Sequence, residues 1–421
     1  MRKIFILSGL ILALLSNGIG LNAQENGTAD FFTVNGVVRD RNTKRTIEYV
    51  NVSAIGTNVG TITNEDGEFS LKISNSLNVK EIRLSCLGYF NSLTTINRNS
   101  TEVITIYLSP ESIVLNEVLV SSWRNPRDLV KAAIDKVEDN YSMKPEMLTG
   151  FYRETVLKRR NYITISEAVI EIFKAAYNMP PDRDQVKVLK GRKLMSPKLS
   201  DTLSVKFLGG PNLGIFLDIV KNPDVLLDLN MLQYYAFRML EATSVDDRVQ
   251  FVVQFEPQML TDYPLYTGTL YIDRETLSFT RAEFRMDMRD KQKVTNTILK
   301  NKPFGLRFTP EDVTYVVTYK QQGDKTYLNY IRNELKFKCD WKRRLFATNY
   351  EVTAESVITD RKEQNVLRMP VRETFTLRQS LSQEVEFYQD ENFWSFYNII
   401  EPTESLENAV NRLKKQVIRA Q

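Results

Sequence analysis

The chain has 421 residues, contains no histidine and carries a formal net charge of +4. The lack of histidine excludes Ser-His-Asp and Cys-His nucleophilic catalysis, zinc sites with imidazole ligands and the usual proton shuttle at neutral pH. A charge this close to neutrality gives the protein no general attraction to nucleic acid. The length suffices for two or three domains, each with its own core.

Residues 1–23 have the pattern of a secretory signal peptide. A basic start with Arg2 and Lys3 precedes an apolar run from Ile4 to Leu15, and Ala23 offers a small residue at the expected cleavage point. The run is shorter than the roughly 20 apolar residues that a membrane span needs. Cleavage would lower the formal charge from +4 to +2, because Arg2 and Lys3 leave and no acid does. The sequence therefore predicts an exported protein.

The two cysteines, Cys86 and Cys339, each belong to an alternating apolar run. Two small buried thiols are the simplest interpretation. A disulfide that ties the front of the chain to its back is the alternative. Because no cysteine precedes Cys86, a lipid anchor is not expected.

Residues 34–108 carry only β-strand signals. Short apolar or alternating runs occur at 34–38, 50–55, 60–62, 69–73, 82–86 and 103–108. Asp66-Gly67, between Ile62 and Phe69, has the residue types of a tight hairpin turn. About seven short strands in roughly 75 residues predict a β-sandwich.

The turns of this region resemble one known family, the carboxypeptidase-regulatory-like domain. Its landmarks are matched in order by Gly36-Val37-Val38-Arg39-Asp40, Tyr49-Val50-Asn51-Val52, Gly56-Thr57-Asn58-Val59-Gly60-Thr61, Thr63-Asn64-Glu65-Asp66-Gly67-Glu68-Phe69 and Leu87-Gly88-Tyr89. The resemblance implies a transthyretin-like or immunoglobulin-like sandwich at 32–109, an accessory module without peptidase activity. Such domains are found on envelope proteins, including the front of many TonB-dependent outer-membrane receptors.

The segment after the sandwich, 110–124, is expected to be a linker. Within it, Leu115-Asn116-Glu117-Val118-Leu119-Val120 is similar to the segment that follows the sandwich in those receptors. The chain then departs from them, because the remaining residues do not accommodate a plug and a long barrel. The resemblance implies a protein of the periplasm, or one associated with the outer membrane, in a Gram-negative-type envelope.

Residues 125–421 predict an α+β domain with a large curved antiparallel sheet and flanking helices. Asn125-Pro126 is a helix start, and Leu129, Ala133, Val137 and Tyr141 then form one apolar stripe over about four turns. Pro145 and Gly150 are expected to end this helix. Further helices are predicted at 213–220 and at the end of the chain, where Leu406, Val410, Leu413 and Val417 form a stripe.

Long alternating runs between these helices predict the sheet. Apolar and polar residues alternate around 250–256, 269–273 and 313–320. This pattern is typical of half-buried antiparallel strands, and a wide sheet of long strands must twist and curl. The mainly β character of the whole chain follows.

Three pieces of this region resemble uncharacterised envelope proteins that carry the same front domain. They are Gly150-Phe151-Tyr152-Arg153-Glu154, Tyr266-Thr267-Gly268-Thr269-Leu270-Tyr271-Ile272-Asp273, and the stretch from Asn392-Phe393-Trp394 to Asn398-Ile399-Ile400-Glu401-Pro402. The middle piece is also similar to the curved half-barrel sheets of periplasmic lipoprotein carriers.

Catalysis by Asp and Glu side chains alone does not require histidine and stays open. A glycosidase needs two acids that face a cleft, and the candidates are Glu167, Glu171, Asp273 and Glu283. Acids are common in the chain, so chance placement is the simpler interpretation. A Ser-Lys pair also stays open, although no Ser-x-x-Lys heads a convincing helix. We therefore expect no catalytic residues.

Two loops resemble ligand motifs only superficially. The acidic stretch that starts at Asn64 has Phe69 where a calcium loop requires Gly, and Asn75 where it requires Glu. The Gly-rich stretch 209–214 contains Pro211, which has no amide donor for a phosphate. We interpret these as a hairpin turn and a plain loop, and expect neither metal nor cofactor.

Three basic clusters are the candidate contact sites: Lys158-Arg159-Arg160, residues 187–193 with Lys190 and Arg192, and Lys342-Arg343-Arg344. Two of them fall at expected turns between strands, where solvated charge is ordinary. If several turns share one rim of the sheet, their charges add and favour anionic headgroups, lipopolysaccharide or an acidic partner.

The sequence leaves three functions open. The leading prediction is a non-catalytic envelope binding or assembly protein whose sandwich docks or spaces it and whose curved sheet recognises a lipid, a glycan or a partner protein, alongside TonB-linked machinery. The first alternative is a carboxylate-based enzyme, such as a glycosidase acting on surface glycan. The second alternative is a purely structural envelope protein.

Overall fold

The computed structural model describes residues 31–111, 123, 125–201, 209–299, 304–341, 347–388 and 393–420. Strands make up 47% of the chain, which confirms the mainly β class. The predicted signal peptide, most of the predicted linker, and Lys342, Arg343 and Arg344 lie outside the described residues.

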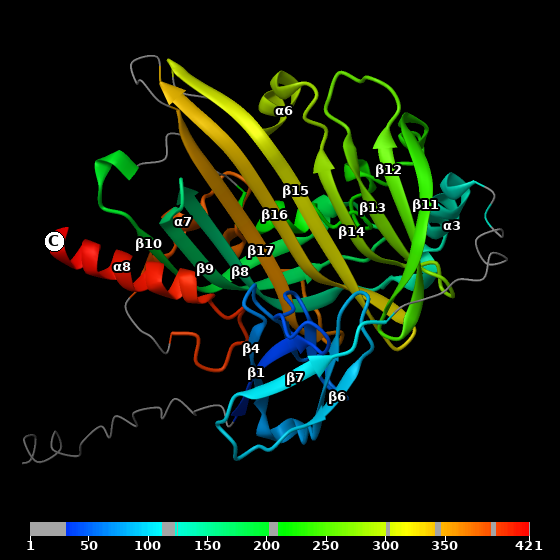
Figure 1. Ribbon diagram of the computed structural model, residues 1–421, viewed down its shortest axis with the longest axis horizontal. Coiled ribbons are helices and arrows are strands. Elements are labelled where there is room, and N and C mark those ends of the chain that lie inside the picture. Colours follow the sequence, from blue (N-terminus) through cyan, green and yellow to red (C-terminus); the bar gives the residue numbers. More distant parts are fainter. Residues whose placement is uncertain are drawn as a thin grey trace, which may run out of the picture.

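The front of the chain forms two small sheets that pack as a sandwich (Figure 1). The first has the order β4-β1-β7 and the second the order β3-β2-β5-β6. Alternate residues of the first strand, including Phe32, Val34 and Val38, are buried between them. The strands are β1 (Phe31–Asp40), β2 (Asn51–Ala54), β3 (Gly60–Ile62), β4 (Glu68–Ser74), β5 (Glu81–Ser85), β6 (Ser92–Thr95) and β7 (Ile104–Leu108). The predicted sandwich is thereby confirmed.

The turn at Asp66-Gly67 is not the hairpin that its residue types predict. Gly67 has a φ of +75°, as expected for such a turn. However, β3 pairs with β2 in one sheet, whereas β4 pairs with β1 in the other. The Asn64 side chain accepts the backbone N–H of Asp66 and Glu68, so a local Asx turn carries the chain between the sheets.

The second part is one eleven-stranded sheet with the order β11-β12-β13-β14-β15-β16-β17-β8-β9-β10-β18. All neighbours pair antiparallel except β10 and β18, which are parallel, so the sheet is mixed. The strands are β8 (Glu146–Lys158), β9 (Asn161–Lys174), β10 (Gln185–Met195), β11 (Tyr235–Val245), β12 (Arg248–Pro257), β13 (Tyr266–Asp273), β14 (Phe279–Met286), β15 (Leu306–Gln322), β16 (Lys325–Trp341), β17 (Thr348–Lys362) and β18 (Glu386–Phe387). The sheet is strongly curved, as long twisted strands require (Figure 1).

Gly150 lies inside β8 and does not end the preceding helix, so that prediction is wrong. A Cβ at this position would stand 2.8 Å from the carbonyl oxygen of Val357 on the neighbouring strand β17. The glycine therefore marks a close approach of two strand backbones.

The helices are α3 (Pro126–Asp135), α4 (Val137–Asn140), α5 (Gly210–Phe216), α6 (Lys291–Ile298), α7 (Leu381–Glu384) and α8 (Glu404–Ala420), and the 3-10 turns are η1 (Asn75–Leu77), η2 (Pro181–Arg183), η3 (Leu199–Asp201), η4 (Pro223–Val225), η5 (Leu232–Tyr234) and η6 (Val371–Glu373). Asn125 caps α3 by accepting the N–H of Arg127, as predicted. The predicted four-turn helix is divided at Lys136 into α3 and α4. The stretch 209–214, predicted to be a plain loop, instead contains the start of α5, so the helix predicted at 213–220 begins and ends earlier.

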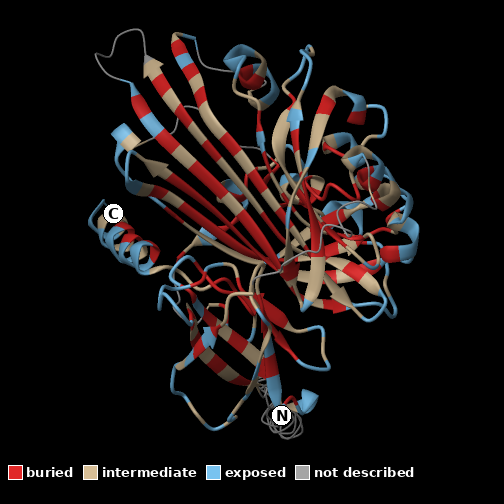
Figure 2. Cartoon of the chain, turned by 45° about the vertical axis from the view of Figure 1, so that its right-hand side comes forward, coloured by how far each residue is buried: buried red, intermediate tan, exposed pale blue. Residues whose placement is uncertain are grey.

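The main core lies between one face of the sheet and a layer formed by α3 and residues 217–235. Buried and partly buried residues alternate along much of β15, whereas β8 and β9 contain continuous buried runs (Figure 2). Phe255 of β12, Ile272 of β13 and Val317 of β15 are buried in this core. Both cysteines are free thiols; Cys339 is buried in the same core and Cys86 packs beside the sandwich core.

The large sheet has two rims, which differ in what covers them. The sandwich contacts one rim, where the N–H of Gly88 donates to the carbonyl of Ser244 at 2.8 Å and the side chain of Asn91 donates to Asp247 at 2.9 Å. At the opposite rim, strand pairing brings together the connections 159–160, 195–201, 258–265, 287–299 and 304–305. We call this opposite edge the distal rim; α6 marks it at the top of Figure 1.

Candidate functional site

A hollow with a volume of about 520 Å³ lies at the distal rim. Its walls come from the β8–β9 turn, the segment after β10, the start of β17 and the second half of α8. The lining residues are Lys158, Arg159, Asn161, Tyr162, Ile163, Ser196, Lys198, Ser200, Asp201, Thr348, Arg412, Leu413 and Gln416. We call this the basic hollow, because four of its side chains are cationic and one is acidic.

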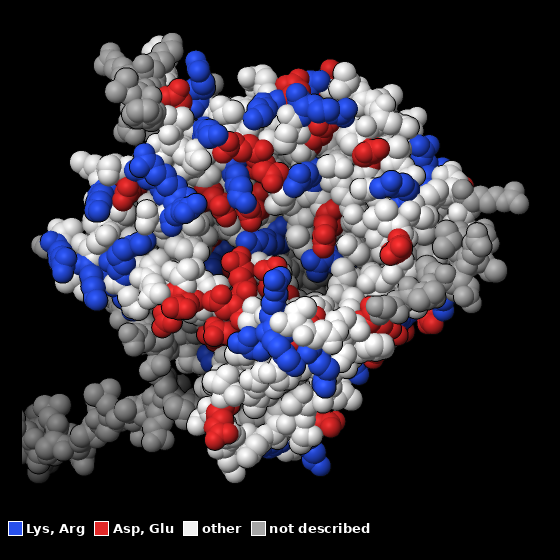
Figure 3. All heavy atoms as spheres, viewed as in Figure 1, with Lys and Arg blue, Asp and Glu red and all other residues white. Residues whose placement is uncertain are grey.

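The position of α8 completes the basic hollow. Leu406 and Leu413 on the apolar stripe of α8 pack against Ile165 of β9 and Leu194 of β10. This packing turns Arg412 towards the β8–β9 turn, where its guanidinium donates to the side chain of Asn161 at 3.4 Å and to the carbonyl of Tyr162 at 3.3 Å. Lys and Arg side chains gather over α8, at the left of Figure 3.

Most of the positive charge in the basic hollow has no acidic partner. Lys158 pairs with Asp201 at 3.0 Å. Burial raises the pKa of Asp201, but hydrogen bonds from Ser196 and Lys158 outweigh it and hold that pKa below its usual value. Among the described residues, Arg159, Lys198 and Arg412 form no ion pair. The described part of the hollow therefore offers three cations without an ion-pair partner beside hydroxyl and amide groups, a donor set that suits a phosphate or a carboxylate.

The predicted basic residues are distributed unevenly. Lys158 and Arg159 line the basic hollow, and Arg160 is exposed in the same turn. Lys190 of β10 lies over the ring of Phe393, with its nitrogen 4.3 Å from the ring centre. Arg192 is an interior residue that pairs with Glu167 at 3.1 Å, so we leave it out of the anionic contact surface.

The sequence patterns do not identify Lys198 or Arg412 as candidate contact residues. Lys198 is a lone lysine after β10, and Arg412 lies on the polar side of a clean amphipathic helix. Neither position carries a local signal, because only the packing of α8 against β9 and β10 brings both to the β8–β9 turn.

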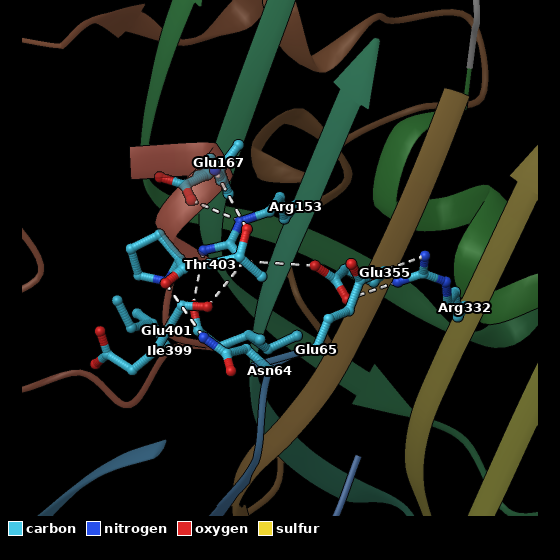
Figure 4. A network of polar contacts seen from close by, with 12 residues as sticks. Asn64, Glu65, Arg153, Glu167, Arg332, Glu355, Ile399, Glu401 and Thr403 are labelled. Atoms are coloured by element: carbon cyan, nitrogen blue, oxygen red, sulfur yellow. Dashed lines mark hydrogen bonds and ion pairs between the residues drawn. The ribbon is translucent and has the colours of Figure 1, made fainter. Parts of the chain in front are cut away.

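A second polar region joins the sandwich to the sheet and centres on Arg153 of β8 (Figure 4). Its guanidinium donates to Glu167 of β9 at 2.7 Å and lies 3.4 Å from Glu355 of β17. It also donates to the backbone carbonyl of Ile400 at 2.7 Å and to that of Glu401 at 3.5 Å. Arg153 therefore holds the C-terminal segment against two strands of the sheet.

The sandwich binds the same C-terminal segment from the other side. The Thr61 hydroxyl donates to the carbonyl of Ile399 at 2.9 Å, and the Asn64 amide donates to that of Pro402 at 3.2 Å. Asn398 exchanges two hydrogen bonds with the backbone of Lys72. We call residues 397–404 the interdomain clamp, because they contact both parts of the chain. The third of the pieces that resemble uncharacterised envelope proteins, which ends at Pro402, includes residues of this clamp. These contacts give that piece a structural role.

A small hollow of about 90 Å³ lies beside the interdomain clamp. Acidic and basic side chains adjoin one another around it, near the middle of Figure 3. Glu65 of the sandwich pairs with Arg332 of β16 at 2.9 Å. Burial raises the pKa of Glu351 and of Glu401, whereas Arg153 and Arg192 outweigh burial and lower the pKa of Glu167. The charged side chains around this small hollow therefore serve largely to hold the sandwich and the sheet together.

The four acids proposed for a glycosidase do not converge. Glu167 is used in the Arg153 network, and Asp273, the last residue of β13, pairs with Arg248 at 2.7 Å. Glu283 on β14 is five strands from β9 in the sheet order, a separation of roughly 24 Å along the sheet. Glu171 lies four residues from Glu167 on β9, about 13 Å away. Glycosidase pairs are about 5–10 Å apart, so none of these pairings matches one.

One buried acid lies on the other face of β8. Glu154 accepts a hydrogen bond from the Tyr152 hydroxyl at 3.1 Å and lines a cavity of about 40 Å³ beside α5. Burial raises the pKa of Glu154 from 4.5 to about 7. In the unfolded chain this acid ionises near 4.5, so the folded state retains its proton over the interval between the two values.

Replacing Glu154 with glutamine is expected to stabilise the protein above pH 7. Below pH 4.5 the carboxyl is neutral in both states and does not change the free energy of unfolding. As the pH rises to about 7, the unfolded chain loses this proton while the folded protein keeps it, so the wild type loses stability. At about 1.4 kcal/mol for each pKa unit, this loss of stability reaches about 3 kcal/mol. Urea unfolding of E154Q and the wild type between pH 4 and 8 measures it, with the exposed substitution E384Q as the control. A constant difference across this range would contradict the assignment.

The fold thus defines a two-part, mainly β protein, in which a sandwich is clamped to a large mixed sheet. Residues 34–120 match the CarboxypepD_reg-like domain family. The front part is therefore a CarboxypepD_reg-like domain, and the resemblance based on its turns is confirmed. No curated protein sequence matches the chain.

Two solved structures are similar to parts of the chain. One is a DUF1329 family protein from Desulfovibrio piger ATCC 29098, with 12% identity and a TM-score of 0.23; the match covers 57% of this chain and 93% of that one. The other is a protein of unknown function from Bacteroides fragilis NCTC 9343, named as membrane-associated, with 9% identity and a TM-score of 0.16; the match covers 79% of this chain and 98% of that one. Similarity at this level assigns no activity.

No described helix is long and apolar enough to cross a membrane. Within the same residues, no group of three or more cysteine or acidic side chains is arranged to hold a metal ion.

Proposed function

We propose that the protein is a non-catalytic binding or assembly protein of the cell envelope, which recognises an anionic group of a lipid or glycan in its basic hollow. The observation that carries this proposal is the charge of Arg159, Lys198 and Arg412, which form no ion pair with the described residues, around a volume of about 520 Å³. A phosphate or carboxylate satisfies guanidinium and ammonium donors with charge-assisted hydrogen bonds. The sandwich serves as the docking or spacing module.

The lining of the basic hollow supports this proposal over the two alternatives, a carboxylate-based enzyme and a purely structural protein. A glycosidase requires paired acids, whereas the described lining of the basic hollow contains a single carboxylate, Asp201, which is already paired with Lys158. A purely structural role gives no reason to gather three cations, unpaired among the described residues, in a hollow at the rim that the sandwich does not contact.

Removing the three cations is expected to weaken binding of anionic ligands about 100-fold. Each cation near an anionic lipid surface contributes about 1 kcal/mol, and about 1.4 kcal/mol corresponds to a factor of ten. The variant is R159S/K198S/R412S, and the probes are phosphatidylglycerol vesicles, a soluble polyuronate and inorganic phosphate. Binding is measured at low and at physiological salt, since added salt must weaken it further.

The matched control is K80S/K131S/R183S, which removes three exposed cations outside the basic hollow. Its binding should equal that of the wild type. Equal losses in both variants would show a general charge effect and would overturn the site. A loss for vesicles alone assigns the anion to a lipid headgroup, and a loss for the polyuronate alone assigns it to a glycan.

A further inference from the structure

Three large hydrophobic side chains stand out by their exposure. Phe304, Leu199 and Leu260 are 98%, 93% and 80% exposed, the highest values among the large hydrophobic residues that the structure describes. All three belong to the distal rim, each in a different connection between strands. Exposed apolar side chains that are scattered singly are ordinary, so the meaning of these three depends on the rim that they share and on the charges beside it.

Strand pairing explains why separate connections meet at this edge. Leu199 follows the end of β10, where Met195 pairs with Thr164 at the start of β9. Leu260 follows the end of β12, and Phe304 precedes β15, whose first residue pairs with the last residue of β16. The apolar tips are therefore spread along the rim and do not form one compact patch.

The basic hollow opens at the same edge. Leu199 directly follows Lys198, and its neighbours Ser200 and Asp201 line the hollow. Arg159 and Arg160 are exposed in the adjacent β8–β9 turn. Cations thus lie next to the apolar tip of Leu199. This combination suits the boundary between anionic headgroups and acyl chains, where apolar side chains leave water while cations remain at headgroup level.

We infer that the distal rim docks on the surface of an anionic lipid bilayer, with Leu199 and Leu260 entering the interface and the basic hollow holding a headgroup. The inference rests on the proposed anion binding and specifies that the anionic group is the headgroup of a membrane lipid. A soluble glycan has no apolar phase to receive the exposed tips. A partner protein would have to provide separate apolar pockets along a curved edge.

Docking in this way would set the orientation of the whole molecule. The sandwich contacts the opposite rim through Gly88, Asn91 and Asn58, the last of which donates to the carbonyl of Arg361 at 2.9 Å. Because the two rims lie at opposite ends of the strands, the sandwich would project into the aqueous space (Figure 1). It would then be free to contact another envelope protein.

Substituting the two leucines tests the inference. L199S/L260S should reduce partitioning onto vesicles of phosphatidylglycerol and phosphatidylcholine at least about tenfold, since two apolar side chains lose their burial. The matched control is L367S/V371S, because Leu367 and Val371 are 77% and 74% exposed but follow β17 at the other end of the strands. The control should partition like the wild type. Both variants replace exposed side chains, so folding should be unaffected.

A soluble probe separates the two proposals. L199S/L260S should bind inorganic phosphate or a soluble polyuronate as the wild type does, because the cations remain in place. Unchanged partitioning of L199S/L260S onto vesicles would overturn the bilayer inference even if R159S/K198S/R412S loses anion binding. A wild-type protein that binds none of the anionic probes would instead overturn the proposed function. Equal losses for L199S/L260S and L367S/V371S would also reject the rim as the docking surface.

Discussion

Replacing Arg153 with methionine is expected to destabilise the protein by about 3–5 kcal/mol, because removing one partner of a buried ionic network leaves the other charges unpaired. Glu167 would keep Arg192 and Tyr388, but Glu355 would lose one of its two arginines. The carbonyls of Ile400 and Glu401 would lose their donor as well. Methionine retains much of the length of the side chain, so the loss reports mainly on polar contacts.

Urea unfolding at neutral pH measures this effect, with R378M as an exposed control. Because Arg153 holds the interdomain clamp, the variant should also expose residues 397–404 to a protease under native conditions, where the wild type resists. R153M with a stability within about 1 kcal/mol of the wild type would show that the network contributes little beyond its own desolvation.

Replacing Asp218 with alanine is the second large effect, again about 3–5 kcal/mol of lost stability. Asp218 is fully buried and accepts hydrogen bonds from the Tyr319 hydroxyl at 2.8 Å and the Tyr177 hydroxyl at 3.1 Å. It also pairs with Lys174 at 2.7 Å. Burial lowers the pKa of Lys174, but Asp184 and Asp218 outweigh it and raise that pKa. The substitution leaves two buried hydroxyls without their acceptor and Lys174 with one acid.

D224A is the matched control, since Asp224 is exposed in the same segment between α5 and β11. Thermal and urea unfolding should separate the two variants clearly. Binding to anionic probes should stay unchanged in D218A at temperatures where the protein remains folded, because Asp218 does not line the basic hollow. A small loss in D218A, equal to that in D224A, would contradict the role of the buried network.

The Arg153 network determines how the front domain is held against the sheet. The sandwich is joined to the sheet through the interdomain clamp, through Glu65 and Arg332, and through the β11–β12 turn. It is therefore a module held in one orientation, and not one attached by its linker alone. The same clamp leads directly into α8, whose second half forms a wall of the basic hollow. The front domain and the proposed site thus share one structural support.

Local patterns were sufficient for the elements whose residues carry their own signal. The Asn125 cap, the apolar stripe of α8 and the alternation in β15 appear as predicted. In β12 the predicted alternation is interrupted, because residues 250–253 are all buried. The sandwich was also recognisable from its turns. The Asp66-Gly67 turn was misassigned because its residues specify a backbone shape, and that shape serves a hairpin and a crossing between sheets equally well.

The candidate site depended on information that no local pattern contains. Lys158 and Arg159 were visible as a basic turn, but Arg412 lies some 250 residues later in the chain. The interior position of Arg192 could not be predicted either, since the sequence of a basic strand does not show which of its faces another segment will cover. Only the packing of α8 and β18 along β9 and β10 decides these positions.

The sequence by itself determined the excluded chemistries, the class of the front domain and the mainly β character of the rest, because composition and short-range periodicity are properties of neighbouring residues. Tertiary structure alone decided the order of the eleven strands, the clamp between the two parts and the convergence of Arg159, Lys198 and Arg412. These features arise from burial of apolar faces between segments far apart in the chain, and the energy of such contacts depends on both partners at once.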